Sequence, residues 1–206
     1  HASMRVNHQW LEHFPNFGRI HEMKGRTVGL IGFGTIGRAV AELLAAFKVK
    51  LLVYDPYVKE HEIREAGGEA VGLEELLRCS DIVSMHARVS ETSKGMMGRE
   101  QFRIMKKTAV FINTARSPLV DMDALYEALK EQWITGAAID NYEVEPVPKD
   151  SPLLNLDNLT FSCHKSGDTV EAFADSPAMV LTQAERYFAG ETPRFLMNPE
   201  VLKGSR

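Results

Sequence analysis

The sequence predicts an α/β fold in which a doubly wound parallel sheet carries helices on both faces. Two observations predict this fold. From Gly25 onwards, short apolar runs alternate with stretches of helical apolar spacing, which is the pattern of parallel strands joined by crossover helices. In addition, a glycine-rich turn at residues 32–37 joins the first apolar run to the first helical stretch. Ligands of such folds bind next to turns of this kind.

The elements follow one another along the chain without an internal repeat. The apolar runs expected to form strands are 27–31, 50–54, 81–85, 109–112, 135–139 and 159–161. The stretches expected to form helices lie near 35–48, 58–66, 73–79, 99–105, 121–132 and 168–189. Right-handed crossovers give the doubly wound strand order. Residues 141–157 hold three prolines and are expected to form an ordered loop.

The glycine-rich turn has the spacing G-x-G-x-x-G, with Gly32, Gly34 and Gly37. In a Rossmann-type fold the first glycine allows the tight turn, the second lets a pyrophosphate approach the backbone, and the third lets the helix pack against the strand. The N–H groups of Thr35 and Ile36 then face an anion, with the helix dipole behind them. A turn used only for packing is the alternative. The strand before it and the helix after it favour a dinucleotide site.

An acidic residue indicates which dinucleotide is bound. Asp55 ends the second apolar run, eighteen residues after Gly37. A carboxylate at this position accepts hydrogen bonds from the ribose hydroxyls of NAD and repels the 2′-phosphate of NADP. No arginine follows directly, because the next residues are Pro56 and Tyr57. The sequence therefore favours NAD.

Composition argues against several other functions. The 206 residues carry a net charge of −4 with no basic cluster, so nucleic acid is not the expected partner. No apolar run approaches the ~20 residues of a membrane span, and no signal peptide is recognisable. Two cysteines, Cys79 and Cys163, cannot form a disulfide framework, which favours the cytoplasm. No metal is expected, because no cysteine–histidine cluster has zinc spacing.

The chain ends set the expected domain limits. Residues 1–4 do not begin with methionine and look like the remnant of a cleaved tag. Residues 5–24 are expected to form a connecting segment, residues 25–189 the nucleotide-binding domain, and residues 190–206 a C-terminal tail.

Polar residues follow the last three predicted strands. Arg116 comes after the fourth run, Asp140 and Glu145 after the fifth, and His164 after the sixth. Ligands bind beyond the carboxyl ends of parallel strands, so these side chains are expected to converge on one cleft. The simpler alternatives are a surface ion pair for Arg116, a solvated turn position for Glu145 and a loop histidine for His164.

Several blocks of the sequence resemble the D-isomer-specific 2-hydroxyacid dehydrogenases, which include phosphoglycerate, glycerate, formate and D-lactate dehydrogenases. The resemblance extends from about Gly25 to Val201. The blocks that carry it are VGLIGFGTIG, DIVSMHARVSETSKGMMG, MKKTAVFINTARSPLVDMDALYEAL, GAAIDNYEVEP and SCHKSGDT. It implies the nucleotide-binding domain of an oxidoreductase that transfers a hydride between a 2-hydroxy acid and NAD.

The resemblance also implies roles for single residues. Arg116 would hold the substrate carboxylate in its planar fork. His164 would exchange the hydroxyl proton, and Glu145 would hydrogen-bond His164. Beyond the glycine turn and Asp55, the residues expected in the cofactor site are His86, Arg88, Ser93, Thr114, Ala115, Arg116, Asp140, His164 and Gly167. For some of these another role is open: a core or strand-end position for His86, a helix cap for Ser93 and a turn cap for Asp140.

The sequence departs from the family pattern beside the expected site. Arg88 and Cys163 each stand where the family has proline, and Lys165 stands where an apolar residue is usual. Ser117-Pro118 replaces a Gly-Glu or Gly-Gly pair. These residues shape the pocket, so the sequence does not identify the 2-hydroxy acid.

Family members carry a further N-terminal region, a domain of about 100 residues that covers the cleft. Only about twenty residues precede the first predicted strand, so an excised nucleotide-binding domain is expected. Such a domain should bind NAD(H) but turn over poorly. The resemblance also implies a homodimer formed through this domain. A non-catalytic NAD-sensing module, similar to the dehydrogenase-like transcriptional corepressors, is the alternative function.

Overall fold

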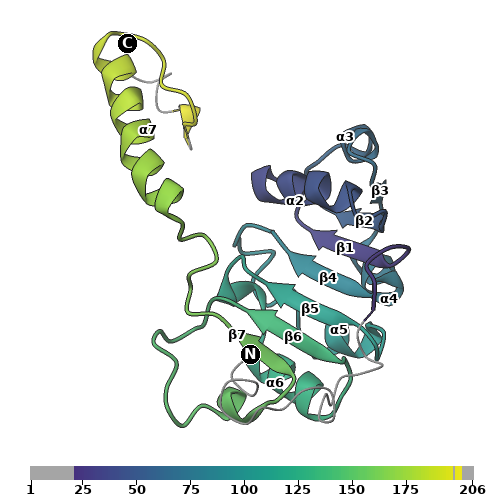
Figure 1. Ribbon diagram of the computed structural model, residues 1–206. Coiled ribbons are helices and arrows are strands. Elements are labelled where there is room, and N and C mark those ends of the chain that lie inside the picture. The colour runs from purple at the N-terminus through teal and green to yellow at the C-terminus, as the bar shows by residue number, and fades with distance from the viewer. Residues whose placement is uncertain (1–20, 197, 201–206) are drawn as a thin grey trace, which may run out of the picture. The chain divides into compact units, whose positions relative to one another are not determined.

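The computed structural model describes residues 21–196 and 198–200. The chain divides into two compact units, the first ending at Cys163 and the second beginning at His164. The first unit contains one sheet with its helices, and the second contains a single long helix (Figure 1).

The sheet of the first unit is parallel throughout and is ordered β3-β2-β1-β4-β5-β6-β7. The strands are β1 Thr27–Ile31, β2 Lys50–Tyr54, β3 Glu69–Ala70, β4 Ile82–Met85, β5 Val110–Asn113, β6 Gly136–Ile139 and β7 Leu159–Phe161. The chain runs outward from β1 to β3, then returns beside β1 with β4 and continues to the other edge. The predicted doubly wound order is therefore confirmed, and the direction of winding changes between β1 and β4.

Helices connect these strands. They are α2 Thr35–Ala45, α3 Glu60–Glu65, α4 Leu73–Cys79, α5 Arg99–Ile104 and α6 Met122–Lys130, with short 3₁₀ helices η1 Ser117–Leu119 and η2 Pro152–Asn155. Two points differ from the sequence prediction. Strand β3 was not expected, because two residues are too few to show periodicity. The expected loop 141–157 contains η2, which begins at Pro152.

The first predicted helix also ends earlier than residue 48. Helix α2 ends at Ala45, and Lys48 has a φ of 55°. This left-handed backbone cannot continue a right-handed helix, although nothing in the side chain of a lysine signals it. The remaining predicted boundaries lie within a few residues of the observed ones.

Alternating side chains of the strands reach opposite faces of the sheet, and helices cover both faces (Figure 1). In β2, Leu51 and Val53 belong to a buried apolar cluster that includes Ile63 of α3. Leu52, between them, belongs to a second cluster that includes Leu76 of α4. The predicted arrangement with helices on both faces is thus confirmed by two separate cores.

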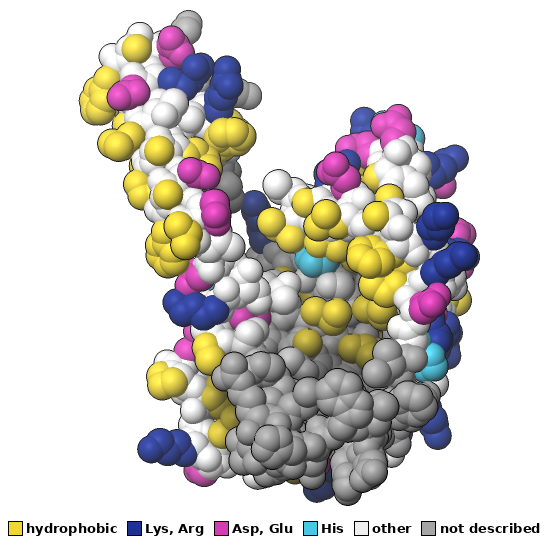
Figure 2. All heavy atoms as spheres, viewed as in Figure 1, with side chains coloured by type: hydrophobic (Ala, Val, Ile, Leu, Met, Phe, Trp, Pro, Cys, Tyr) yellow, Lys and Arg dark blue, Asp and Glu magenta, His cyan; other side chains and the backbone are white. Residues whose placement is uncertain are grey.

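The second unit consists mainly of α7, Val170–Phe188. Its N-cap is Thr169, whose side chain accepts a hydrogen bond from the Ala172 N–H at 3.1 Å. None of its residues is buried, and Phe173 and Phe188 are exposed. Figure 2 shows hydrophobic side chains along the surface of this helix. Within residues 21–196 and 198–200, no helix is both long enough and apolar enough to cross a membrane.

The absence of a side chain at Gly29 allows α4 to pack closely on β1. A Cβ atom at this position would overlap Oγ of Ser80 and the side chain of Leu76. We expect Gly29→Ala to lower the free energy of unfolding by about 1–3 kcal/mol, the usual effect of overpacking a core. Urea unfolding measures this change.

Gly72→Ala provides the control for Gly29→Ala. A Cβ atom on Gly72 would have no atom within 4 Å, and its φ of −68° is accessible to alanine. Its cost should stay below about 1 kcal/mol, because only the preference for glycine at a helix N-cap is lost. Equal losses in the two variants would contradict close packing at Gly29.

Candidate nucleotide-binding and active site

The glycine turn has the geometry that its spacing predicts. Gly32 has a φ of 96°, and a Cβ atom on it would lie 2.5 Å from the backbone nitrogen of Ala87. A Cβ atom on Gly37 would overlap the carbonyl oxygen of Gly32. A Cβ atom on Gly34, in contrast, would meet no atom within 4 Å. Gly32 and Gly37 are therefore required by packing, whereas Gly34 leaves open space beside the backbone.

The turn leads directly into α2, an eleven-residue helix that begins at Thr35. Gly34 is the N-cap residue and contributes no side chain. The first N–H groups of an α-helix have no partner within the helix, and the positive end of the helix dipole lies at the same place. The exposed N–H groups of Thr35 and Ile36 therefore suit a pyrophosphate.

Asp55 is held beside the turn by two backbone groups. Its Oδ2 accepts a hydrogen bond from the Phe33 N–H at 2.7 Å, and its Oδ1 accepts one from the Tyr57 N–H at 2.9 Å. Each carboxylate oxygen has a second lone pair. The carboxylate can thus accept further hydrogen bonds from ribose hydroxyls without giving up its backbone partners.

A cleft of about 1230 Å³ extends along the carboxyl ends of the strands. The predicted cofactor residues that line it are Gly32, Gly34, Thr35, Ile36, Asp55, His86, Arg88, Ser93, Thr114, Ala115 and Arg116. The structure thus brings together residues from the turns that follow four strands. The open glycine turn, the ordered carboxylate and the size of the cleft fit a dinucleotide.

His86 lies at the end of β4, next to the glycine turn. Its backbone N–H donates to the Ile31 carbonyl at 2.7 Å, and its Nε2 lies 2.9 Å from Oγ of Ser84. Burial lowers the pKa of His86, so the imidazole is neutral near pH 7. His86 directly follows a strand and also lines the cleft. The two roles that the sequence left open, a strand-end position and a place beside the cofactor, therefore do not exclude each other.

Ser93 organises the loop that contains Arg88. The Ser93 hydroxyl donates to the Arg88 carbonyl at 2.8 Å and accepts from the Ser90 N–H at 2.7 Å. The hydroxyl folds its own loop in this way, so the helix cap that the sequence left open for Ser93 is wrong. Ser93 lines the cleft, and its place in the cofactor site stays a prediction.

The loop after β5 carries Arg116 at the far end of the cleft. Arg116 is exposed, and its Nη1 donates to the Ala115 carbonyl at 2.6 Å. The backbone of this loop is bonded to Asn113, a fully buried residue that the sequence analysis did not select. Its only sequence signal is its place at a strand end, which it shares with many structural asparagines.

Ser162 and Tyr142, which the sequence analysis did not select, hold the end of β6. Asp140 is buried and does not line the cleft, and its Oδ1 accepts a hydrogen bond from the Ser162 hydroxyl at 2.7 Å. Tyr142 stacks on Phe161, and its hydroxyl donates to the Ser162 carbonyl at 2.8 Å. Burial, with nearby Cys163 and Asp140, raises the pKa of Tyr142.

Glu145 is oriented from the same loop. Its Oε1 accepts a hydrogen bond from the Tyr142 N–H at 2.9 Å. His164 and Gly167 belong to the second unit, and His164 has a φ of 54°. The convergence of His164 with Arg116 and Glu145 therefore stays a prediction.

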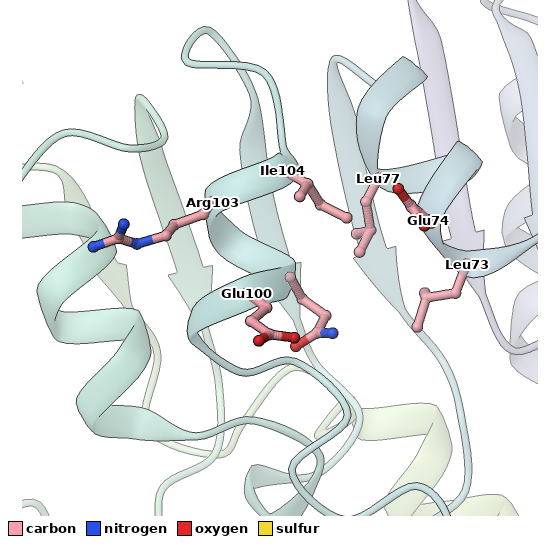
Figure 3. Close-up of a pocket in the computed structure, with 7 residues that line it drawn as sticks. Leu73, Glu74, Leu77, Glu100, Arg103 and Ile104 are labelled. Atoms are coloured by element: carbon pink, nitrogen blue, oxygen red, sulfur yellow. The ribbon is translucent and has the colours of Figure 1, made fainter.

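A second hollow, of about 540 Å³, lies between α4 and α5 and contains none of the predicted site residues. Leu77 and Ile104 face each other across it, whereas Arg103 points away (Figure 3). Arg103 instead lies over the ring of Trp133, with 4.3 Å between its Cζ atom and the ring centroid. Over the described residues, no group of three or more histidine, cysteine or carboxylate side chains could hold a metal ion.

Comparisons with known proteins identify the family. Residues 1–166 match the model of the "D-isomer specific 2-hydroxyacid dehydrogenase, NAD binding domain". A glyoxylate reductase of Korarchaeum cryptofilum is 43% identical over 89% of this chain and 55% of its own length. A D-3-phosphoglycerate dehydrogenase of Methanocaldococcus jannaschii is 39% identical over 86% of this chain and 34% of its own length.

Solved structures agree with this assignment. A D-isomer specific 2-hydroxyacid dehydrogenase of Lactobacillus delbrueckii ssp. bulgaricus, in its NAD-complexed form, superposes with a TM-score of 0.80 and 29% identity. The match covers 93% of this chain and 61% of that one. The chain thus spans about half the length of the first curated relative reported above.

The buried His86 predicts a pH dependence of stability. Its pKa in the folded protein lies below the ordinary value of 6.5, so the unfolded chain binds the proton first as the pH falls. The contribution of neutral His86 to the free energy of unfolding is therefore fully present above pH 6.5, and it is lost as the pH falls towards the pKa of His86 in the folded protein.

Urea unfolding at pH 7.5 and pH 5.5 measures this loss. We expect the free energy of unfolding to fall less in His86→Gln than in the wild type over this range. An equal fall in both proteins would mean that His86 is not responsible.

Proposed function

Since the chain belongs to the D-isomer specific 2-hydroxyacid dehydrogenase family, we propose that it is the NAD-binding domain of an enzyme that interconverts a 2-hydroxy acid and a 2-keto acid. One observation carries the proposal. A single cleft is lined both by the glycine turn after β1 and by Arg116 after β5, two strands further along the sheet. A dinucleotide lying along this cleft would bring its reactive ring towards Arg116.

The chain supplies the groups that hold the coenzyme. Backbone N–H groups at Thr35 and Ile36 bind the pyrophosphate, and Asp55 binds the adenosine ribose. Arg88, Ser93 and the residues before Arg116 complete the walls. NAD, when bound, supplies the nicotinamide ring that accepts or donates the hydride.

At the substrate end we assign three roles. Arg116 binds the substrate carboxylate, because a guanidinium remains charged and pairs with both oxygens. His164 takes the proton from the C2 hydroxyl oxygen during oxidation and returns it during reduction. Glu145 holds the other ring nitrogen of His164, while Asp140 and Gly167 support the nicotinamide side.

The names of the relatives favour a small 2-keto acid, and glyoxylate is the first substrate to test. The 43% identity to a glyoxylate reductase exceeds the 39% identity to a D-3-phosphoglycerate dehydrogenase. Both relatives are named as enzymes, which favours a dehydrogenase over an NAD-sensing module. A panel of 2-keto acids, assayed with NADH on the protein that carries this domain, tests the assignment.

We also propose a cytoplasmic homodimer. Both cysteines, Cys79 and Cys163, are exposed and free, which suits a reducing compartment. The dimer rests on the family resemblance. We expect the 206-residue chain to bind NADH.

Gly34→Ala separates binding from packing. Nothing lies within 4 Å of the added Cβ atom, so only the preference for glycine at a helix N-cap is lost, and the melting temperature should fall by no more than about 4 °C. The methyl group blocks the approach of the pyrophosphate, and we expect the NADH Kd to rise at least about tenfold, or about 1.4 kcal/mol. Fluorescence titration of the 206-residue chain measures this rise. An unchanged Kd would place the coenzyme elsewhere.

Arg116→Ala tests the substrate end. Losing a charged pair with the carboxylate should raise the KM for the 2-keto acid about 10- to 100-fold, which corresponds to about 1.5–3 kcal/mol. Steady-state kinetics on the protein that carries this domain measure the effect. The NADH Kd should stay within about twofold of the wild type. A KM that does not change would remove Arg116 from carboxylate binding.

A further inference from the structure

We propose that Asn113 is a positioning residue that sets the place of the Arg116 guanidinium. The inference rests on the role proposed above for Arg116 and adds a buried residue that does not touch the cleft. Asn113 ends β5 and is completely buried. A buried polar side chain is costly unless it is hydrogen-bonded, so its partners indicate what it does.

Both ends of the Asn113 amide are bonded to the loop that carries Arg116. Its Oδ1 accepts from the Ala115 N–H at 3.0 Å, and its Nδ2 donates to the Arg116 carbonyl at 3.1 Å. One partner is a donor and the other an acceptor, so the orientation of the amide is fixed. The asparagine amide offers a donor and an acceptor on two separate atoms, whereas an ionised aspartate has no donor and leucine has neither. Neither aspartate nor leucine can replace it.

The guanidinium itself rests on the same loop. Nη1 of Arg116 donates to the Ala115 carbonyl at 2.6 Å. Ala115 is thus held by Asn113 through its N–H group and contacts the guanidinium through its carbonyl oxygen. Movement of the Ala115 peptide would therefore move the side chain that is proposed to bind the carboxylate.

The chain after Arg116 is fixed from another direction. Gly95 N–H donates to the Pro118 carbonyl at 2.8 Å, and Met97 N–H donates to the Leu119 carbonyl at 3.1 Å. These bonds anchor η1 to residues 95–97. Asn113 anchors the stretch before η1, so that Arg116 lies between two fixed points.

A second buried amide connects this loop to its neighbour. Asn141 follows β6, is almost completely buried, and has its Oδ1 3.5 Å from Nδ2 of Asn113. A backbone hydrogen bond links the same two strand ends, because the Asp140 N–H donates to the Asn113 carbonyl at 3.1 Å. The loop with Glu145 begins at this point. The Asn113–Asn141 pair thus links the two loops that carry Arg116 and Glu145.

The experiment compares Asn113→Ala with Asn158→Ala in the protein that carries this domain. Asn158 is a matched control, because its Nδ2 also donates to two carbonyl oxygens, those of Leu129 at 3.1 Å and Thr135 at 3.4 Å. These partners lie near the amino ends of β6 and β7, whereas Asn113 lies at the carboxyl end of β5. Both variants should melt at a lower temperature than the wild type.

The expected difference lies in the kinetics with glyoxylate. Asn113→Ala should raise the KM about tenfold, the weakening expected of a misplaced charged contact, with the NADH Kd within about twofold of the wild type. Asn158→Ala should change neither the KM for glyoxylate nor the NADH Kd. Asn113→Asp keeps the shape and the acceptor for Ala115, and it should raise the KM in the same direction. Asn113→Asp provides the test if the alanine variant does not fold.

A folded Asn113 variant with a wild-type KM would overturn the inference. Parallel changes of KM in the Asn113 and Asn158 variants would overturn it as well, because they would indicate a general loss of stability. Hydrogen exchange at the Ala115 amide supplies a readout that does not need turnover, and this amide should exchange faster in Asn113→Ala. If the wild type reduces no 2-keto acid, the proposed function fails, and the exchange rate alone decides whether Asn113 holds the loop.

Discussion

The close approach of β1, α2 and β4 around Gly32 is the constraint on which the rest of the structure depends. A side chain on Gly32 would collide with the backbone at Ala87, and one on Gly37 would collide with Gly32 itself. Because both positions lack a side chain, α2 starts immediately after the turn. Its first N–H groups therefore face the cleft, with Asp55 on one side and His86 on the other. The same two glycines thus allow the close packing and open the space that the proposed pyrophosphate site needs.

Parallel pairing extends this arrangement along the sheet. Because all seven strands are parallel, their carboxyl ends lie at the same side of the sheet, and the turns after β1, β2, β4 and β5 line one cleft. Short bonds inside each turn then set the details. Ser93 folds the loop of Arg88, and Asn113 folds the loop of Arg116. The sheet brings the loops together, and local hydrogen bonds shape each of them.

The sequence predicted those features that periodicity or an unusual residue reveals. Six strands and the glycine turn were predicted because apolar runs alternate and because glycine has no substitute at Gly32. Asp55 was predicted because it ends the second apolar run, eighteen residues after Gly37. Asn113, Ser162 and Tyr142 could not be predicted, because they act through a few hydrogen bonds to nearby loop groups, and such bonds leave no repeating pattern in the sequence. The left-handed Lys48 is similar, since its backbone angle is set by the surrounding chain and not by its side chain.

The two backbone bonds on Asp55 have a consequence for the thermodynamics of association. A flexible carboxylate loses rotational freedom when it binds a ribose, at a cost of about 0.5–1.5 kcal/mol for an immobilised side chain. The Asp55 carboxylate is already held by the Phe33 and Tyr57 N–H groups, so most of this entropy is lost during folding. At the proposed ribose site, the adenosine end of a dinucleotide would thus meet a rigid acceptor.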